Sequence, residues 1–345
     1  MLGAETLREL LGWLRGHGQL RRPGPTVVAE QHYDTDLDEV VGQAEARWAI
    51  EVAAAGAHHL LLTGPPGTGK TMLAQRLPGL LPPLGDQEAL EVTAIHSVDG
   101  LLSTEQPLIT RPVFVAPHPT SSVSALVGGG SGMARPGAVS QAHRGVLFLD
   151  ECPEFGSRAL EALRTPLEDG ELRIARRDGV ARYPVRFQLV LAANPCPCAP
   201  ARELDCVCPP TVRRRYLGRL SGPLLDRVDL RVQMRGIASC ALTDGAAESS
   251  AAVRKRVADA RAAAALRWTA YGWRTNAEVP GPALRQRFRL DRAPLEIALR
   301  KGQITARGAD RALRVAWTLA DLGGRGRPEG NDVRSALTFR DQRAA

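Results

Sequence analysis

The chain has 345 residues, 44% of them hydrophobic, which is enough for two or three domains with a sizeable buried core. Its formal net charge is +8, but all except three of its 45 basic residues are scattered arginines, so charge alone leaves nucleic-acid binding open. No apolar run approaches the roughly 18 residues of a membrane span, and the N-terminus lacks a secretion pattern. We therefore expect a cytoplasmic protein with no membrane partner.

The first 31 residues read as a short helix and a linker. The amphipathic stretch ETLRELLGWL is followed by RRPGPT, whose prolines and glycine interrupt regular structure. The next segment, QAEARWAIEVAAA (43–55), has apolar residues at helical spacing and many alanines. It leads directly into HLLLTG, which we predict to be a strand.

Short apolar and β-branched runs then alternate with helical or loop segments. Four of them predict further strands: LEVTAI (90–95), GVLFLD (145–150), RFQLVLAAN (186–194) and DLRVQM (229–234). Uninterrupted apolar strands are buried on both faces, which is typical of a mostly parallel sheet between helices. We therefore predict an α/β core of about five strands over residues 32–243.

After residue 244 the strand signals vanish. The remaining sequence contains helical patterns such as SSAAVRKRVADARAAAALRWTAY and RGADRALRVAWTLADLGG, with glycine ending two of the helices. We predict a helical C-terminal domain over residues 244–345.

A phosphate-binding loop is predicted between the strand HLLLTG and the helical TMLAQRL. The sequence there fits G-x-x-x-x-G-K-[ST], in which backbone amides and a helix N-terminus surround phosphates. Its lysine is a compact charge on a flexible stem that can reach the β- and γ-phosphates, and its threonine hydroxyl can bind Mg²⁺. The residues of this loop are Gly64, Pro65, Pro66, Gly67, Thr68, Gly69, Lys70 and Thr71.

Polar residues at two other strand ends complete the predicted site. Asp150 and Glu151 follow the strand GVLFL, where Asp150 would hold Mg²⁺ and Glu151 would polarise the attacking water. Asn194 ends the strand LVLAA, and its amide could orient that water. Each of these has a structural alternative when taken alone: a solvated strand end for the acids, and a cap of the turn before Pro195 for the asparagine.

Four cysteines are crowded into the segment CPCAPARELDCVC. Cys196, Cys198, Cys206 and Cys208 form two C-x-C pairs separated by seven residues. Four thiolates could close a tetrahedral Zn²⁺ site, although structural zinc motifs more often use C-x₂₋₄-C. The alternative is two reduced cysteine pairs in a loop.

With these strand-end motifs in order, the chain resembles the AAA+ ATPases, and more closely their magnesium-chelatase-like branch, which includes YifB and ComM. The matching stretches include VVGQAEARWAIEVAAAGAHHLLLTGPPGTGKT, AHRGVLFLDECPEF, ANPCPC and RRRYLGRLSGPLLDRVDL, and the resemblance runs from about residue 34 to the C-terminus. It implies a P-loop AAA+ core with a C-terminal helical lid domain, with ATP and Mg²⁺ bound between the subunits of a homo-oligomeric ring, usually a hexamer.

The resemblance also assigns residues beyond the loop. Arg227 in LLDRVDL matches an arginine finger that reaches the neighbouring subunit, and its structural alternative is pairing with Asp226 or Asp229. Arg307 in ITARG matches the sensor-2 arginine, with Arg311 in reserve. The expected nucleotide contacts also include three residues close to the motif: Val41, Gly42 and Met72.

Family members carry two insertions, and both have counterparts here. One precedes Asp150, around HSVDGLLSTEQPLITRPVFVAPHPTSSVSALVGGGSG, and the other is a predicted hairpin, GELRIARRDGVARYPV. The tip residues Arg176 and Arg177 could contact phosphates in a central pore, or they form a charged solvent-facing turn.

Two features depart from the family pattern. Members usually have a Lon-protease-like domain ahead of the ATPase, and residues 1–31 resemble only its final helix and linker, so we expect a truncated or short variant. The family sequence NPCPC is commonly followed by glycine, whereas this chain has Ala199, so the turn could differ.

By this resemblance, we expect a Mg²⁺-dependent ATPase motor that remodels DNA as a branch-migration helicase. Two alternatives remain open at this point. One is a magnesium-chelatase-type motor subunit for metal insertion, and the other is a nucleotide-dependent scaffold.

Overall fold

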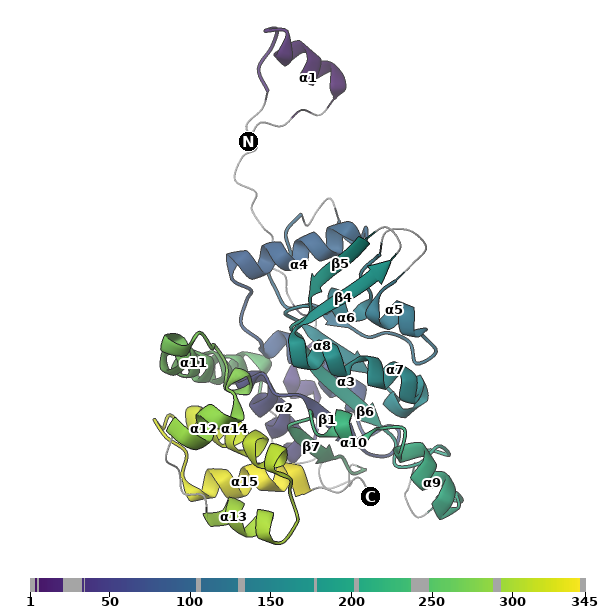
Figure 1. Cartoon of the computed structure of the whole chain (residues 1–345), viewed down its shortest axis with the longest axis vertical. Helices are drawn as coiled ribbons and strands as arrows, with labels where there is room; N and C mark the ends of the chain where they lie inside the picture. Colours follow the sequence, from purple (N-terminus) through teal and green to yellow (C-terminus); the bar gives the residue numbers. More distant parts are fainter. Residues whose placement is uncertain are drawn as a thin grey trace.

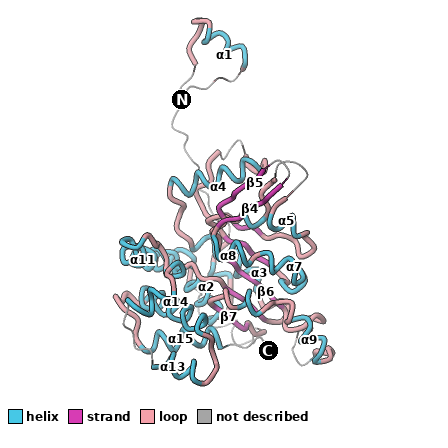
Figure 2. The backbone as a smooth tube through the Cα atoms, in the orientation of Figure 1, coloured by secondary structure: helices cyan, strands magenta, loops and turns pink. Residues whose placement is uncertain are grey.

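The computed structural model describes residues 4, 6–20, 33, 35–103, 107–129, 134–176, 179–201, 205–236, 248–287 and 293–341. A five-stranded parallel sheet has the strand order β2-β3-β6-β1-β7 (Figures 1 and 2). Its strands are β1 (Leu60–Thr63), β2 (Phe114–Val115), β3 (Val146–Leu149), β6 (Gln188–Ala193) and β7 (Leu230–Gln233). The predicted α/β fold with a mostly parallel sheet is confirmed.

The central strands are apolar on both faces, and alternate residues serve two separate cores. In β1, Leu60 and Leu62 pack into one hydrophobic cluster and Leu61 into the other. In β3, Phe148 and Leu149 divide in the same way. Because side chains alternate across a strand, a continuous apolar run is what a sheet covered on both faces requires.

Helices flank the sheet, and Figure 1 shows them on both sides of it. Those of the N-terminal and core regions are α1 (Leu7–Leu14), α2 (Ala44–Gly56), α3 (Lys70–Leu80), α4 (Asp86–Val98), α5 (Val123–Val127), α6 (Ala138–Gln141), α7 (Gly156–Ala162), α8 (Arg164–Asp169), α9 (Pro210–Leu217) and α10 (Gly222–Leu225). Helix α1 buries none of its residues. Among the described residues, we find no helix that combines the length and apolar character needed to cross a bilayer.

One predicted strand is wrong. Residues 90–95, LEVTAI, lie inside helix α4, and the short β2 occupies the sheet edge instead. The buried residues of α4 are Ala89, Val92 and Ile95, spaced at three, which places them on one helical face. The side chain of Glu88 accepts a hydrogen bond from the backbone of Gly85 and caps the start of the helix.

The predicted hairpin is present. Strands β4 (Glu171–Arg176) and β5 (Gly179–Pro184) pair antiparallel in a separate two-stranded sheet. In Figure 1 the hairpin lies near α4, away from the C-terminal helices. Arg177 at its tip lies outside the described residues.

The C-terminal region is helical, as predicted. Its helices are α11 (Ser250–Trp268), α12 (Gly281–Arg287), α13 (Ala293–Arg300), α14 (Ala306–Leu322) and α15 (Gly330–Asp341). Helix α11 packs against α2 and α3, and α14 packs against α2 and α15. The expected domain boundary at residue 244 falls between residues 236 and 248, a stretch that the structure does not describe.

Candidate nucleotide-binding site

The glycine-rich segment between β1 and α3 makes a turn that favours glycine at three positions. Gly67 and Gly69 have φ angles of 75° and 87°, in the left-handed region where side chains are disfavoured. An added Cβ at Gly64 would lie only 2.4 Å from the carbonyl oxygen of Met234, just after β7. The backbone therefore turns tightly from the end of β1 into the N-terminus of α3.

The side chain of Lys70 is buried inside this turn. Its ammonium donates hydrogen bonds to the carbonyl oxygens of Gly64 (2.7 Å) and Pro65 (2.8 Å) and to Oδ1 of Asn194 (3.1 Å). Burial lowers the pKa of Lys70, while the nearby carboxylate of Asp150 opposes this shift. The turn thus holds a cation by its own oxygen atoms.

Two acidic residues follow β3 directly beside the loop. The hydroxyl of Thr71 donates a hydrogen bond to Oδ2 of Asp150 at 2.6 Å, and the other carboxylate oxygen accepts one from the backbone of Glu151 at 2.9 Å. Glu151 is exposed, and its φ of 47° places it in the left-handed region, which is uncommon for a residue with a side chain.

The sheet order explains why these residues meet. Strands β3, β6 and β1 are neighbours, and all run parallel, so their carboxyl ends share one edge. The structure therefore brings together Lys70, Thr71, Asp150 and Asn194 from three separate stretches of sequence, with Glu151 adjacent. Asn194 contacts the lysine through its side chain, which a mere cap of the following turn would not require.

This group of residues fits a nucleotide with Mg²⁺. An added Cβ at Gly67 or Gly69 would meet no atom within 4 Å, so these glycines leave the space in front of the turn free. The N-terminus of α3 offers backbone N–H groups and a positive dipole to an anion. A hydroxyl and a carboxylate, here from Thr71 and Asp150, are the oxygen ligands that Mg²⁺ prefers.

A residue that we did not predict ties the loop to its surroundings. Nε2 of Gln43 donates hydrogen bonds to the carbonyl oxygens of Thr68 (3.3 Å) and Arg235 (2.6 Å). Val41 and Gly42, two of the predicted contacts, directly precede Gln43 in the sequence. The hydrogen bonds of Gln43 therefore bring them next to the loop. Met72, the third added contact, has an exposed side chain in the first turn of α3.

Arg227 lies at the opposite edge of the sheet. Two residues later, the backbone N–H of Asp229 donates to the carbonyl oxygen of His59, just before β1 begins. Arg227 itself is buried; it donates to the carbonyl oxygen of Pro223 at 2.5 Å and forms an ion pair with Glu168 of α8. Its partner is thus neither of the two aspartates that the sequence offered.

The loop after Arg227 is linked to the C-terminal helices through a buried carboxylate. Asp229 accepts a hydrogen bond from Arg311 of α14 at 2.8 Å, and its other oxygen lies 3.5 Å from Nδ1 of His58. Burial by itself would raise the pKa of Asp229, but Arg311 and His58 hold it well below the usual value. Burial is the largest cause that lowers the pKa of Arg227, and the charge of the exposed Arg307 adds to it.

The four clustered cysteines do converge. The Sγ atoms of Cys196, Cys198, Cys206 and Cys208 all lie within 4.8 Å of one another. Cys196 is buried and Cys198 is exposed, so the cluster reaches from the protein interior to its surface. Ala199, which stands in the family's glycine position, has a φ of 43° and so adopts the backbone conformation that glycine favours.

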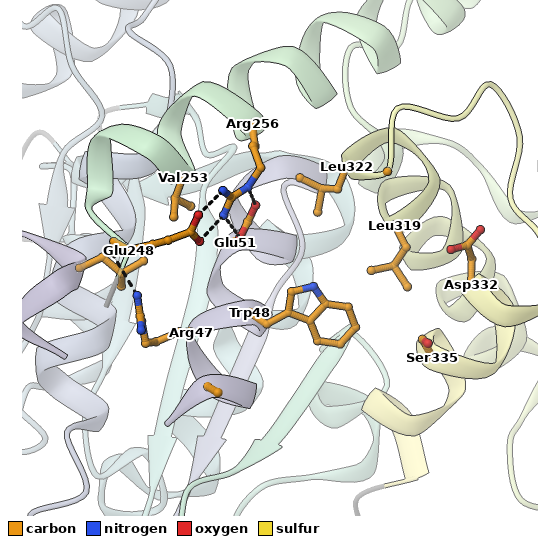
Figure 3. A pocket seen from close by; sticks show the side chains of 13 residues that line it. Arg47, Trp48, Glu51, Glu248, Val253, Arg256, Leu319, Leu322, Asp332 and Ser335 are labelled. Carbon is orange, nitrogen blue, oxygen red and sulfur yellow. Dashed lines mark hydrogen bonds and ion pairs between the residues drawn. The ribbon is translucent and has the colours of Figure 1, made fainter. Parts of the chain in front are cut away.

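A cavity of about 670 Å³ lies between α2, α11, α14 and α15 (Figure 3). On its wall, the guanidinium of Arg256 pairs with the carboxylates of Glu51 and Glu248 at 2.6 Å each, and Trp48 faces the cavity from α2. No residue that lines it belongs to the predicted nucleotide site, so we do not assign this cavity to the nucleotide.

Comparison with known proteins identifies the family of this chain. The model for magnesium chelatase, subunit ChlI, matches residues 36–242, and the model for the C-terminal part of the same subunit matches residues 247–340.

The matches to individual relatives cover nearly the whole chain. An uncharacterized protein of Mycobacterium tuberculosis is 65% identical over 98% of this chain and 68% of its own length. YifB of Escherichia coli is 43% identical over 92% of this chain and 63% of its own length. The competence protein ComM of Haemophilus influenzae is 40% identical over 93% of this chain and 64% of its own length. The chain thus spans about two thirds of these relatives.

Proposed function

Because the chain belongs to the family of the magnesium-chelatase subunit ChlI, we propose that it is a Mg²⁺-dependent ATPase of the AAA+ type. The observation that carries the proposal is the meeting of two hydrogen-bonded pairs, Lys70 with Asn194 and Thr71 with Asp150, at the carboxyl edge of the sheet. This edge is where open α/β sheets bind their ligands.

Each residue of this group has a role that follows from its chemistry. Lys70 neutralises the β- and γ-phosphates of ATP, with the backbone amides of residues 64–71 surrounding them. Thr71 and Asp150 would hold Mg²⁺, which supplies positive charge at the phosphates. Glu151 accepts a proton from the attacking water, and Asn194 orients that water through its amide.

The sixth residue of the site, a positively charged arginine, comes from a second subunit in this proposal. Arg227 lies at the amino edge of the sheet, remote from the loop of its own chain, so it can complete only a site on a neighbour. An arginine finger supplied in this way can contribute about 10³–10⁵-fold in rate. Arg307, exposed near it, is the candidate for a second arginine at the same interface. We therefore propose a homo-oligomeric ring, a hexamer by analogy with the family.

The direct test of the ATPase is a Glu151→Gln variant. The neutral amide keeps the size of the side chain but removes the base, so ATP should still bind while turnover falls about 10²-fold or more. Binding is measured with a fluorescent ATP analogue, and turnover by phosphate release. Glu154→Gln, three residues on and also exposed, is the matched control and should retain wild-type turnover. Wild-type protein that binds ATP without hydrolysing it would instead favour the nucleotide-dependent scaffold.

We further propose DNA as the substrate that the motor moves, in line with the competence protein ComM among its relatives. The β4–β5 hairpin supports this, because it extends from the core and carries the exposed Arg173 and Arg182. The alternative is a motor subunit for metal insertion, which the name of the matching family favours.

ATP hydrolysis measured with and without a four-way DNA junction separates these two functions. A DNA motor should hydrolyse ATP several times faster with the junction, and Arg173→Glu with Arg182→Glu should weaken this stimulation while leaving the basal rate unchanged. If neither single-stranded nor branched DNA alters the rate, the DNA function is excluded and the metal-insertion alternative gains.

A further inference from the structure

We propose that Cys196, Cys198, Cys206 and Cys208 bind one structural Zn²⁺ ion. Adjacent sulfur atoms lie 3.3 Å (Cys196 to Cys198), 3.7 Å (Cys198 to Cys206) and 3.4 Å (Cys206 to Cys196) apart. Four thiolates around zinc, each about 2.3 Å from the ion, form a tetrahedron with edges of about 3.8 Å. The three sulfur–sulfur distances are slightly shorter than this edge, so a small outward movement of the thiols would admit the ion.

The backbone around the cluster is arranged for sulfur ligands. Residues Cys196 to Ala199 form a tight turn, in which the N–H of Ala199 donates to the carbonyl oxygen of Cys196 at 3.2 Å. Backbone groups of Ala199, Cys198 and Val207 also hydrogen-bond to Sγ of Cys196, Cys208 and Cys198, respectively. Such N–H donors offset negative charge on metal-bound thiolates and fix their directions.

The size and softness of the cluster select the ion. An iron–sulfur cluster holds several metal atoms between its cysteines, so its sulfur ligands lie farther apart than one ion requires, whereas these four atoms fit within 4.8 Å. Thiolates prefer soft or borderline metals to Mg²⁺ or Ca²⁺. With four protein ligands the site has no open position, which marks it as structural rather than catalytic.

The place of the cluster in the fold shows what the ion would stabilise. Cys196 comes two residues after Asn194, and Cys208 comes two residues before α9, so the cluster closes the connection from β6 to this helix. On α9, the buried Tyr216 has its hydroxyl hydrogen-bonded by the backbone of Asn194. A zinc ion would therefore pin the segment that follows Asn194 at both of its ends. This role is independent of whether the protein hydrolyses ATP.

Metal analysis of the full chain tests the proposal without any activity assay. Protein purified under reducing conditions without chelator should contain one zinc per chain by elemental analysis and by native mass. A Cys206→Ser/Cys208→Ser variant should lose the zinc. Cys152→Ala, which removes a buried thiol outside the cluster, should retain it. Iron in place of zinc, a metal-free protein, or a mass lower by the hydrogens lost in disulfides would each overturn the proposal.

A second measurement covers the case in which the double variant does not fold. Wild-type protein is stripped with a strong zinc chelator under reducing conditions and then titrated with Co²⁺. Binding at these four thiolates gives the intense visible bands of tetrahedral cobalt together with sulfur charge-transfer absorption, at one equivalent. Zinc should then displace the cobalt and raise the melting temperature of the stripped protein. Weak octahedral cobalt bands, or no change of melting temperature with zinc, would contradict a structural tetrathiolate site.

Discussion

Lys70 is held by three oxygen atoms, and this explains why arginine would not replace it. Two of these oxygens belong to the backbone of the turn and lie 2.7 and 2.8 Å from a single nitrogen. A planar guanidinium is wider than an ammonium and cannot place one atom among all three acceptors. The ammonium can also exchange these contacts for phosphate oxygens by rotating its stem.

We accordingly expect Lys70→Arg to lose function despite keeping the charge. ATP affinity should fall at least about tenfold and turnover about 10²-fold, because the phosphates lose a correctly placed cation. Lys255→Arg and Lys301→Arg are matched controls, since these exposed lysines are the other two in the chain. Calorimetric ATP titration and phosphate release provide the readouts. Wild-type affinity in Lys70→Arg would show that the ammonium is not essential.

We expect His59 to make the fold sensitive to acid. Burial lowers the pKa of His59 from 6.5 to about 4, and its Nδ1 accepts a hydrogen bond from the backbone N–H of Leu189 at 3.0 Å. The unfolded chain therefore takes up a proton near pH 6.5, which the folded chain takes up only near pH 4. As the pH falls through this window, the free energy of unfolding should decrease, by up to about 3 kcal/mol from this group.

The His59→Asn variant tests this expectation. Its amide oxygen can accept the same hydrogen bond but does not titrate. Urea unfolding between pH 7 and pH 4 (a window of about three units around the two pKa values) should therefore show a shallower loss of stability than in the wild type. His17→Asn, which changes an exposed histidine, should follow the wild-type curve. Identical slopes for His59→Asn and the wild type would mean that His59 does not carry the acid sensitivity.

At the level of single residues, the sequence indicated which side chains lie together wherever a motif coincided with a strand end, while the roles of these side chains stay predictions. Lys70, Asp150 and Asn194 each follow an apolar strand, and parallel strands deliver their carboxyl ends to one edge. Gln43 and Glu168 were not expected. Their partners, the Thr68 carbonyl and Arg227, are 25 and 59 residues away in sequence, and no local pattern indicates such pairs.

At the level of elements, the junction between α2 and α14 depends on a glycine. An added Cβ at Gly56, the last residue of α2, would lie 2.1 Å from Nε2 of His58 and 2.4 Å from Oγ1 of Thr318. These two atoms are themselves hydrogen-bonded at 2.8 Å and buried. Glycine at this position therefore allows the two helices to approach.

We expect Gly56→Ala to destabilise the protein even though alanine is the better helix former. Overpacking of this kind costs about 1–3 kcal/mol, against a gain of at most about 1 kcal/mol in helix propensity. The midpoint of urea unfolding should fall. In Gly222→Ala, where the added Cβ would meet no atom within 4 Å, it should stay level or rise. A stabilised Gly56→Ala would show that α2 and α14 separate easily at this point.

Flanking residues explain why the strand predicted at residues 90–95 is a helix. LEVTAI contains a valine, a threonine and an isoleucine, which favour strands, but it is only six residues long. Its neighbours decide the outcome, because Glu88 caps a helix start and Ala89 extends the apolar face by one turn. Short apolar runs do not distinguish strand from helix unless such flanking residues are weighed.

At the level of the whole molecule, mixing two inactive variants tests the shared site. Arg227→Ala keeps an intact loop and Lys70→Ala keeps an intact arginine, so a site between them has both. In a random one-to-one mixture, about a quarter of the interfaces combine a working loop with a working arginine, and about that fraction of wild-type activity should return. Arg227→Ala leaves Glu168 unpaired, but this side chain is 57% exposed and therefore remains solvated.

The control mixture combines Lys70→Ala with Glu151→Gln. Both defects affect the same edge of the chain, so every interface contains a damaged loop and no activity should return. Recovery of activity in the control mixture would mean that activity returns without a shared site. No recovery in the mixture with Arg227→Ala would place that arginine outside the neighbour's site.

The arrangement of the C-terminal helices could not be derived from local sequence. They are joined to α2 by long-range contacts, including Arg256 with Glu51 and His58 with Thr318, whose partners are 205 and 260 residues apart. Helical periodicity predicts the helices themselves because that signal lies within each segment. It says nothing of which helix faces which, because this depends on charge pairs and close packing between distant parts of the chain.

In the proposed ring, Lys70 and Arg227 lie at opposite edges of the sheet, so each subunit would have a head and a tail. Joining unlike surfaces in this way is a heterologous contact, and its repetition either closes into a ring or continues as an open filament. In such an assembly, a subunit in which only Lys70 or only Arg227 is replaced would damage one of its two interfaces. Which interface is damaged would reveal the polarity of the assembly.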